Sequence, residues 1–454
     1  MDVTAFLTQL QRMPFYQGQI VHLEQISRRS ARYGALDAPL PPALHASLRA
    51  QGIERLFTHQ AAALNAARAG RHLVVVTGTA SGKTLCYNLP VLETILERPA
   101  DRALYLYPTK ALAQDQLRAL GELGCQSLDA RQTAARPADR SLSRGERAGV
   151  REAAALPVTI GTYDGDTPQA RRSKLRQLGQ IILTNPDMLH MGILPNHALW
   201  ASLFRRLRIV VIDEAHTYRG VFGSQVACVL RRLRRICTLY GSEPLFIAAS
   251  ATIANPGQHL SALTGLAPLV IDDDGSPAGP RSFALWNPPL LGAGRGSVGD
   301  RPQRQIGEGD RPQQSGLRRS ANGEATQLFA ALVRSDTRTI LFTRARKVAE
   351  LILRYARAEL AKEQKPQRGG SRNRTARDRH PDAHQPTPDS SGHASRVTDH
   401  SSRIAAYRAG YTPEQRRQIE ADLFSGRLIG VTATNALELG IDVGGLDAAV
   451  LVGY

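Results

Sequence analysis

Residues 74–84 read VVVTGTASGKT, a β-branched run that leads into a glycine-rich turn. A helical spacing of leucines follows, so the sequence predicts a strand, a phosphate-binding loop and a helix. In such a loop, backbone N–H groups and the helix N-terminus point at the phosphates of a bound nucleotide. Lys83 would reach the β- and γ-phosphates, and Thr84 would place its hydroxyl on Mg²⁺. The loop residues predicted to bind nucleotide are Thr79, Ala80, Ser81, Gly82, Lys83 and Thr84.

The loop departs from the strict pattern G-x-x-x-x-G-K-[ST] at its first position, which is Thr77. A chance Gly-Lys-Thr in a strand-to-helix turn is therefore an alternative at this point. Just upstream, Gln60 could read an adenine edge with its amide, which offers both a donor and an acceptor. Phe57 could stack on the same base. An ordinary helix start would explain both residues equally well.

The composition favours a polyanionic partner. The 454 residues include 58 Lys or Arg and 40 Asp or Glu, which gives a formal net charge of +18. This excess indicates nucleic acid first and an anionic membrane second, although basic disordered segments would also account for part of it. The length predicts roughly two to four domains.

The four cysteines form no C-x-x-C pair, so the sequence indicates neither a zinc site nor a disulfide framework. Reduced thiols are typical of a cytoplasmic protein. The first residues show no secretory signal. No apolar run is long enough to cross a bilayer, so we expect no membrane partner.

A second pattern points to nucleotide hydrolysis. Residues 207–212 predict a buried strand that ends in Asp213-Glu214-Ala215-His216. In a chain with a phosphate loop, Asp213 can hold Mg²⁺, and Glu214 can orient or deprotonate the attacking water. Adjacent carboxylates are common on surfaces, so the strand, the position and the order together carry this interpretation.

Polar residues also follow three other predicted strands, at 103–107, 181–183 and 245–249. Strand ends that feed helix N-termini are where α/β sheets bind ligands. Groups suited to a nucleic-acid phosphate follow the first two strands: Pro108, Thr109, Lys110, Thr184 and Asn185. Ser250 and Thr252 follow the third strand, and we expect them beside the carboxylate strand.

A second alternation of strands and helices begins at Glu324. Its predicted strands are 339–343, 404–407, 429–434 and 448–452, and its predicted helices are 347–360 and 413–424, the latter capped by Thr412. The stretches 293–318 and 365–402 have the composition of disordered inserts. We therefore expect a helical segment at 1–50, a first α/β domain at 51–271, a linker at 272–323 and a second domain at 324–454.

These motifs, in this order, resemble the superfamily-2 DEAD/DEAH-box helicases. Within that resemblance a Thr at the first loop position is ordinary, which removes the doubt at Thr77. It implies two RecA-like P-loop NTPase domains of α/β class, the cofactors ATP and Mg²⁺, and a nucleic-acid substrate. It assigns phosphate and metal chemistry to Lys83, Thr84, Asp213 and Glu214. Further roles implied are coupling by His216, Ser250 and Thr252, completion of the site by Gly440 and Asp442, and nucleic-acid binding by Thr343, Arg344, Thr432, Thr434 and Asn435 in addition to the residues of the first domain.

A narrower resemblance is to the RecQ-four-related repair helicases of the mitomycin repair factor A group. It lies in residues 213–224, 407–414 and 433–442. It implies 3′-to-5′ translocation on single-stranded or forked DNA, a role in DNA repair and a cytoplasmic, nucleoid-associated location; it leaves protein partners open. An RNA helicase and a non-catalytic nucleic-acid-binding protein remain alternatives.

The sequence departs from this group at its end. The arginine-rich motif VI and the zinc-binding Cys cluster would follow Tyr454 and do not occur in this chain. Because an arginine finger is worth roughly 10³–10⁵ in rate, we expect this chain to bind ATP but to hydrolyse it poorly.

Overall fold

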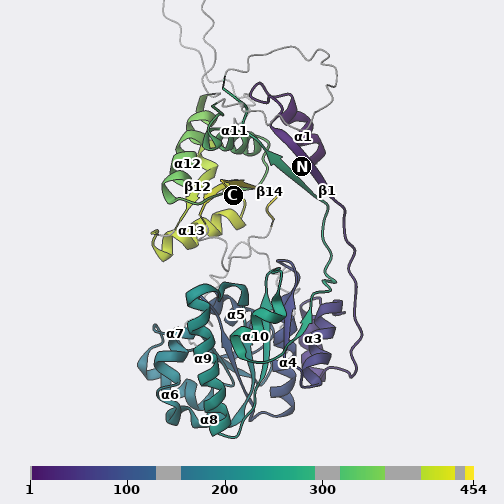
Figure 1. The fold of residues 1–454 in the computed structure, drawn as a ribbon, viewed down its shortest axis with the longest axis vertical. Coiled ribbons are helices and arrows are strands. Elements are labelled where there is room, and N and C mark those ends of the chain that lie inside the picture. Colours follow the sequence, from purple (N-terminus) through teal and green to yellow (C-terminus); the bar gives the residue numbers. More distant parts are fainter. Residues whose placement is uncertain are drawn as a thin grey trace, which may run out of the picture. The chain divides into compact units, whose positions relative to one another are not determined.

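The computed structural model describes residues 3–128, 155–291, 317–362, 400–408, 410–434 and 445–453. Two compact units result: one comprises Ile26–Arg281, and the other comprises Met1–Gln25 together with Ser282–Tyr454. Each contains a parallel sheet with helices packed on it (Figure 1). The predicted inserts lie outside the described residues except at their last positions, where Arg318 pairs with Leu290 and His400–Arg403 forms a 3₁₀ turn.

The larger unit is built on an eight-stranded sheet in which every neighbouring pair is parallel. Its strands, in spatial order, are β4 (Gln126–Ser127), β5 (Thr159–Thr162), β6 (Ile181–Thr184), β3 (Arg102–Leu106), β7 (Leu207–Ile212), β8 (Leu245–Ser250), β2 (Leu73–Val76) and β9 (Leu269–Ile271). The strands predicted from apolar runs are confirmed. Short, continuous apolar runs are expected of parallel strands because both faces of such a sheet are covered.

Alternating strand residues serve two separate cores. Val75 packs on one face with α2 (Pro42–Ala50), α3 (Thr58–Arg68), α4 (Lys83–Glu97) and α5 (Lys110–Glu122). Val74 and Val76 pack on the other face, where the covering helices are α6 (Gln169–Leu178), α8 (Ala201–Arg206), α9 (Gly220–Leu239) and α10 (Pro256–Thr264). Because helices cover both faces of this sheet, ligands are expected at the carboxyl ends of its strands.

The second unit holds a four-stranded parallel sheet in the order β12 (Ile404–Tyr407), β13 (Gly430–Ala433), β11 (Thr339–Thr343), β14 (Ala448–Val452). Its helices are α11 (Ala321–Arg334), α12 (Arg346–Ala361) and α13 (Pro413–Phe424). The predicted start of α13 is confirmed: the Thr412 hydroxyl accepts a hydrogen bond from the Gln415 backbone N–H at 3.3 Å. Proline at the first helical position fits the same cap.

The N-terminal prediction is wrong in part. Residues 1–50 contain the helices α1 (Val3–Gln11) and α2, but also strand β1 (Ile20–Ile26). β1 pairs with β10 (Arg281–Trp286) in a two-stranded sheet. Local patterning did not reveal this strand because its partner lies far away in the sequence and its residues are mostly exposed.

The first 25 residues complete the core of the second unit. Phe6 and Leu10 of α1 pack with Ala331 and Leu332 of α11. In the same unit, the carboxylate of Glu324 is only 3% exposed. It accepts hydrogen bonds from the Gln19 side-chain amide and the Trp286 indole, each at 3.1 Å. A buried carboxylate needs such donors, so these contacts hold the N-terminal segment to α11.

Leu10→Ala should destabilise the second unit. Leu10 is 2% exposed, and a buried Leu→Ala change costs about 2–5 kcal/mol. Hydrogen exchange would show faster exchange of the α11 amides and unchanged exchange in β2 and β7. Leu260→Ala in α10, also fully buried, is the matched control and should affect the larger unit instead. Unchanged α11 exchange in Leu10→Ala would contradict the assignment of α1 to this core.

Candidate functional site

Three neighbouring strands bring the predicted site residues to one edge of the large sheet. β7, β8 and β2 are adjacent and parallel, with Ile212 beside Ala248 and Val76 beside Ser250. The carboxyl ends of parallel strands open on the same edge. The phosphate loop, Ser250 and the carboxylates after Ile212 therefore lie together, as predicted.

The phosphate loop has the backbone that its glycine requires. Gly82 caps α4 with a φ of 77°, and a Cβ there would lie 2.6 Å from the Gln60 side-chain nitrogen. Ala80 also has a positive φ, of 58°, which is strained for a residue with a side chain. Inside the loop, the hydroxyls of Thr77 and Ser81 are 2.6 Å apart. The curled loop leaves Thr79 and Ala80 exposed.

Lys83 folds across its own loop. Its ammonium donates to the carbonyl oxygen of Thr77 at 3.1 Å and to that of Gly78 at 2.6 Å. This places the cation at the loop that is predicted to hold phosphates. Thr84 follows at the start of α4 and is half-buried.

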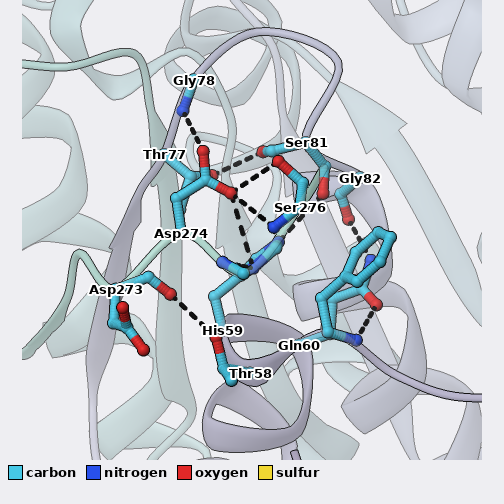
Figure 2. A network of polar contacts seen from close by, with 12 residues as sticks. Thr58, His59, Gln60, Thr77, Gly78, Ser81, Gly82, Asp273, Asp274 and Ser276 are labelled. Carbon is cyan, nitrogen blue, oxygen red and sulfur yellow. Dashed lines mark hydrogen bonds and ion pairs between the residues drawn. The ribbon is translucent and has the colours of Figure 1, made fainter. Parts of the chain in front are cut away.

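A buried histidine supports the loop from behind (Figure 2). His59 is fully buried, and its Nε2 lies 3.0 Å from the carbonyl oxygen of Ser81, while its Nδ1 accepts from the Gly275 backbone N–H at 3.3 Å. Burial lowers the pKa of His59. The neutral ring with hydrogen on Nε2 satisfies both contacts, so it links the loop to the chain that follows β9.

Asp274 joins the same support. Its carboxylate accepts from the Gly78 backbone N–H at 3.4 Å and from the Ser276 hydroxyl at 2.6 Å (Figure 2). It also accepts from Arg29 at 2.7 Å. Burial opposes ionisation, but the hydrogen bonds from Ser276 and the pairing with Arg29 lower the pKa of Asp274 to about 2. We did not predict His59 or Asp274 as site residues. Three consecutive aspartates directly after a strand were the available signal for Asp274.

Gln60 is hydrogen-bonded to the phosphate loop. Its amide oxygen accepts from the Phe57 backbone N–H at 2.9 Å, and its amide nitrogen donates to the Gly82 carbonyl at 3.1 Å. Gln60 is 2% exposed, and the ring of Phe57 stacks with Tyr33 and with His59. The predicted reading and stacking of an adenine by Gln60 and Phe57 stay predictions.

The carboxylates after β7 are partly buried. Asp213 accepts from the Glu214 backbone N–H at 2.8 Å and from the Tyr87 hydroxyl at 2.9 Å. Burial, with the nearby charge of Glu214, raises the pKa of Asp213 to about 6, and burial also raises the pKa of Glu214. Glu214 has a φ of 48°, a strained backbone of the kind that clusters at functional sites.

His216 lies between two of the predicted motifs. Its Nδ1 is 3.2 Å from the Glu214 carboxylate and accepts from the Ala251 backbone N–H at 3.3 Å. Burial lowers the pKa of His216. Ser250 is buried and donates to the Ala251 carbonyl at 2.8 Å, whereas Thr252 is exposed. The structure thus places His216 beside the segment that follows β8. The predicted role of His216, Ser250 and Thr252 in coupling stays a prediction.

The donor set fits Mg²⁺ held together with a nucleotide. Within the described ranges, no three or more His, Cys, Asp or Glu side chains are grouped to hold a metal ion by themselves. Mg²⁺ is usually held by one or two carboxylates together with substrate phosphates. Asp213 and the Thr84 hydroxyl, next to the phosphate loop, offer such a partial set.

The residues predicted to bind nucleic acid in the larger unit divide into surface and buried groups. Thr109 caps α5, where its hydroxyl accepts from the Leu112 backbone N–H at 3.4 Å, and the exposed Lys110 pairs with Asp166 at 2.8 Å. Pro108, just before this cap, is half-buried.

The next strand end is similar. Asn185 caps α7 (Pro186–Met188) by accepting from the Met188 backbone N–H at 2.8 Å. The Thr184 hydroxyl is buried and donates to the Tyr163 carbonyl at 2.6 Å, so it has a structural contact here. Binding of nucleic acid by these residues stays a prediction.

In the second unit, three predicted threonines are buried. The hydroxyl of Thr343 donates to the Ala345 carbonyl and that of Thr432 to the Ala349 carbonyl, each at 3.1 Å, and Thr434 is 3% exposed. Arg344 is exposed. Of the other predicted residues, Asn435, Gly440 and Asp442 lie outside the described residues.

The comparisons with known proteins agree with this geometry. The DEAD/DEAH box helicase family matches residues 57–259, which include Gln60, the phosphate loop and the carboxylates. The chain contains a DEAD/DEAH box helicase domain. In the part of the chain that the structure describes, no helix is long and apolar enough to cross a bilayer.

Two curated relatives match nearly the whole chain. The uncharacterized ATP-dependent helicase YprA of Bacillus subtilis is 39% identical over 96% of this chain and 47% of its own length. The ATP-dependent helicase hrq1 of Schizosaccharomyces pombe is 35% identical over 100% of this chain and 36% of its own length. The chain thus spans about half the length, or less, of these two relatives.

A solved structure matches both units. The DUF1998 helicase MrfA, crystallised with DNA and AMPPNP, is 37% identical over 100% of this chain and 51% of its own chain, with a TM-score of 0.76. The predicted fold, RecA-like α/β with parallel sheets, and the predicted resemblance to this group of helicases are confirmed.

His59→Ala should weaken nucleotide binding, because it leaves the Ser81 carbonyl and the Gly275 N–H behind the loop without partners. An unsatisfied buried group costs about 1–3 kcal/mol, so we expect about tenfold weaker binding of a fluorescent ATP analogue. Arg32→Ala is the control: it removes an exposed ion pair with Asp273, for which the expected cost is below about 1 kcal/mol. Equal affinities in both variants would contradict the supporting role of His59.

Proposed function

We propose that this chain is the motor of an ATP-dependent DNA helicase that moves 3′ to 5′ along single-stranded or forked DNA and acts in DNA repair. The observation that carries the proposal is the common edge of β7, β8 and β2, where a phosphate loop lies beside a partly buried pair of carboxylates. The names of YprA and hrq1 support ATP-dependent helicase activity, and MrfA was crystallised with DNA. A nucleoid-associated location would follow from such a substrate.

The first step is the capture of the nucleotide. Backbone N–H groups of residues 79–84 and the N-terminus of α4 surround the phosphates, and Lys83 exchanges its carbonyl partners for phosphate oxygens. Asp213 and Thr84 would hold the metal. Mg²⁺, when bound, neutralises charge that develops on the phosphates. The support behind the loop keeps its backbone in the strained conformation that binding requires.

Glu214 is the residue that we assign to the attacking water. Burial raises its pKa, which makes it a stronger base once it is ionised at neutral pH. His216 accepts a hydrogen bond from the Ala251 backbone N–H and lies beside the Glu214 carboxylate, so a movement of Glu214 would be felt by the segment after β8. Gly440 and Asp442 would complete the site from the second domain.

DNA would bind along neighbouring strand ends. β3 lies beside β7, and β6 lies beside β3, so the segments around Lys110 and Asn185 continue the same edge of the sheet. Their amides, hydroxyl and ammonium group suit backbone phosphates and carry no base specificity. In the second domain we assign the same role to the segments at Arg344 and Thr434–Asn435.

Glu214→Gln should abolish turnover and preserve binding. General-base catalysis is worth about 10²–10⁴ in rate, so ATP hydrolysis in the presence of single-stranded DNA should fall at least about 10²-fold. Affinity for a fluorescent ATP analogue should change little. Glu243→Gln, an exposed carboxylate before β8 at the opposite edge of the sheet, is the matched control. Turnover that survives in Glu214→Gln would refute the assignment of the base.

Lys110→Ala should weaken DNA binding in a salt-dependent way. Loss of one phosphate contact reduces the slope of log affinity against log salt by about 1. Titration of a labelled oligothymidylate at several salt concentrations measures this slope, and Lys174→Ala on α6 controls for the loss of one exposed charge. A competing oligouridylate of equal length tests the alternative: stronger competition by RNA than by DNA would favour an RNA helicase.

A further inference from the structure

A buried polar network contacts the carboxylate of Asp213, the proposed metal ligand. It contains Tyr87 and Asn88 of α4, Tyr105 of β3 and Gln116 of α5, of which Gln116 is the most exposed at 6%. Tyr87 donates to Asp213 at 2.9 Å. Nothing in the mechanism above requires hydroxyls and amides here, where apolar side chains would avoid the cost of burying polar groups.

The hydroxyl of Tyr87 faces two acceptors. The carboxylate oxygen of Asp213 is 2.9 Å away, and the side-chain oxygen of Gln116 is 3.3 Å away. A hydroxyl has one hydrogen and can donate it to only one of them. The two acceptors therefore compete, and any small movement of Gln116 changes how the hydrogen is shared.

The amides in this network allow a second arrangement. In the present one, Gln116 donates to the side-chain oxygen of Asn88 at 3.1 Å, Tyr105 donates to the same oxygen at 3.0 Å, and the Asn88 amide nitrogen has no partner among the described residues. Rotation of both amides by 180° would exchange their donors and acceptors. Gln116 would then donate to Tyr87, whose hydrogen would belong to Asp213 alone.

Gln116 lies on the helix that begins at the predicted DNA contact. α5 starts at Lys110, directly after the cap at Thr109. Asn88 and Tyr87 lie on α4, which starts at the phosphate loop. The network thus joins the helix that begins at the phosphate loop to the helix that begins at the predicted DNA contact. Rotation of its amides would supply the two discrete arrangements that coupling requires.

We propose that Tyr87 and Gln116 form a relay through which DNA at residues 108–110 controls the metal-binding carboxylate. Without DNA, Gln116 shares the hydrogen of Tyr87, which weakens the hydrogen bond from Tyr87 to Asp213. DNA bound at the start of α5 favours the second arrangement, in which Tyr87 donates to Asp213 alone and fixes its orientation toward Mg²⁺. Tyr87 is a positioning residue, and this proposal rests on the proposed function.

The test measures coupling at equilibrium, so it does not depend on turnover. Mn²⁺ replaces Mg²⁺, and electron paramagnetic resonance gives its affinity for the chain with saturating AMPPNP, with and without oligothymidylate. In the wild-type chain DNA should tighten Mn²⁺ binding by about fivefold or more. By reciprocity, adding Mn²⁺ to the chain with saturating AMPPNP should tighten DNA binding by the same factor. A fluorescence titration with DNA checks this.

Two variants should break the coupling in opposite ways. Tyr87→Phe removes only the hydroxyl, so Mn²⁺ should stay weakly bound whether or not DNA is present. Gln116→Met removes the competing acceptor at similar length, so Mn²⁺ should bind tightly already without DNA, and DNA should add nothing.

Tyr105→Phe is the matched control. It removes a buried hydroxyl from the same network, one that contacts Asn88 and not Asp213. Its thermal stability should fall about as much as that of Tyr87→Phe, but DNA should still tighten Mn²⁺ binding, because the contact between Tyr87 and Asp213 remains. A second substitution in the network should not restore the coupling when the hydroxyl at position 87 is absent.

The outcomes separate the two proposals. Wild-type coupling in Tyr87→Phe, or equal loss of coupling in Tyr105→Phe, would overturn the relay. A wild-type chain that binds DNA and metal–nucleotide independently would overturn the relay and leave the helicase proposal intact. A wild-type chain that binds no DNA would overturn both.

Discussion

The parallel pairing of β7, β8 and β2 is the constraint on which the site depends. The ladder places Val76 beside Ser250 and Ile212 beside Ala248, so three segments far apart in the sequence end at one edge. Both faces of these strands are packed against helices. The free energy of that burial holds the strand ends in place, and the polar residues that follow them can adopt conformations that would be unfavourable elsewhere.

Those conformations carry a cost that the surroundings offset. Ala80 and Glu214 both have a positive φ, and Asp213 is desolvated enough to raise its pKa to about 6. The hydrogen bonds of His59 and Asp274 hold the loop from behind, and the Glu214 N–H and the Tyr87 hydroxyl satisfy the carboxylate of Asp213. A phosphate loop that is costly to assemble in this way already has its backbone conformation before a nucleotide binds.

In the second unit, parallel strands again bring polar residues to one edge of a sheet, and the N-terminal segment adds to the core. Four parallel strands place Thr343 and Thr434 at neighbouring strand ends. α11 is covered by α1, and Glu324 of α11 accepts hydrogen bonds from Gln19 in the segment after α1 and from Trp286 of β10. The beginning of the chain is therefore part of a domain whose remaining residues follow position 281.

The sequence by itself predicted most strands of the two parallel sheets, several helices and the polar residues at strand ends, because a buried parallel strand and an amphipathic helix leave local periodic patterns. Lys83, Asp213, Glu214 and His216 could be named for that reason. Only the tertiary structure decided that β1 pairs with β10, that Asp274 and His59 support the loop, and that Tyr87 is shared between Asp213 and Gln116. These contacts join residues with no local pattern in common. They depend on the order of strands and the packing of helices, and both are set by burial summed over the whole domain.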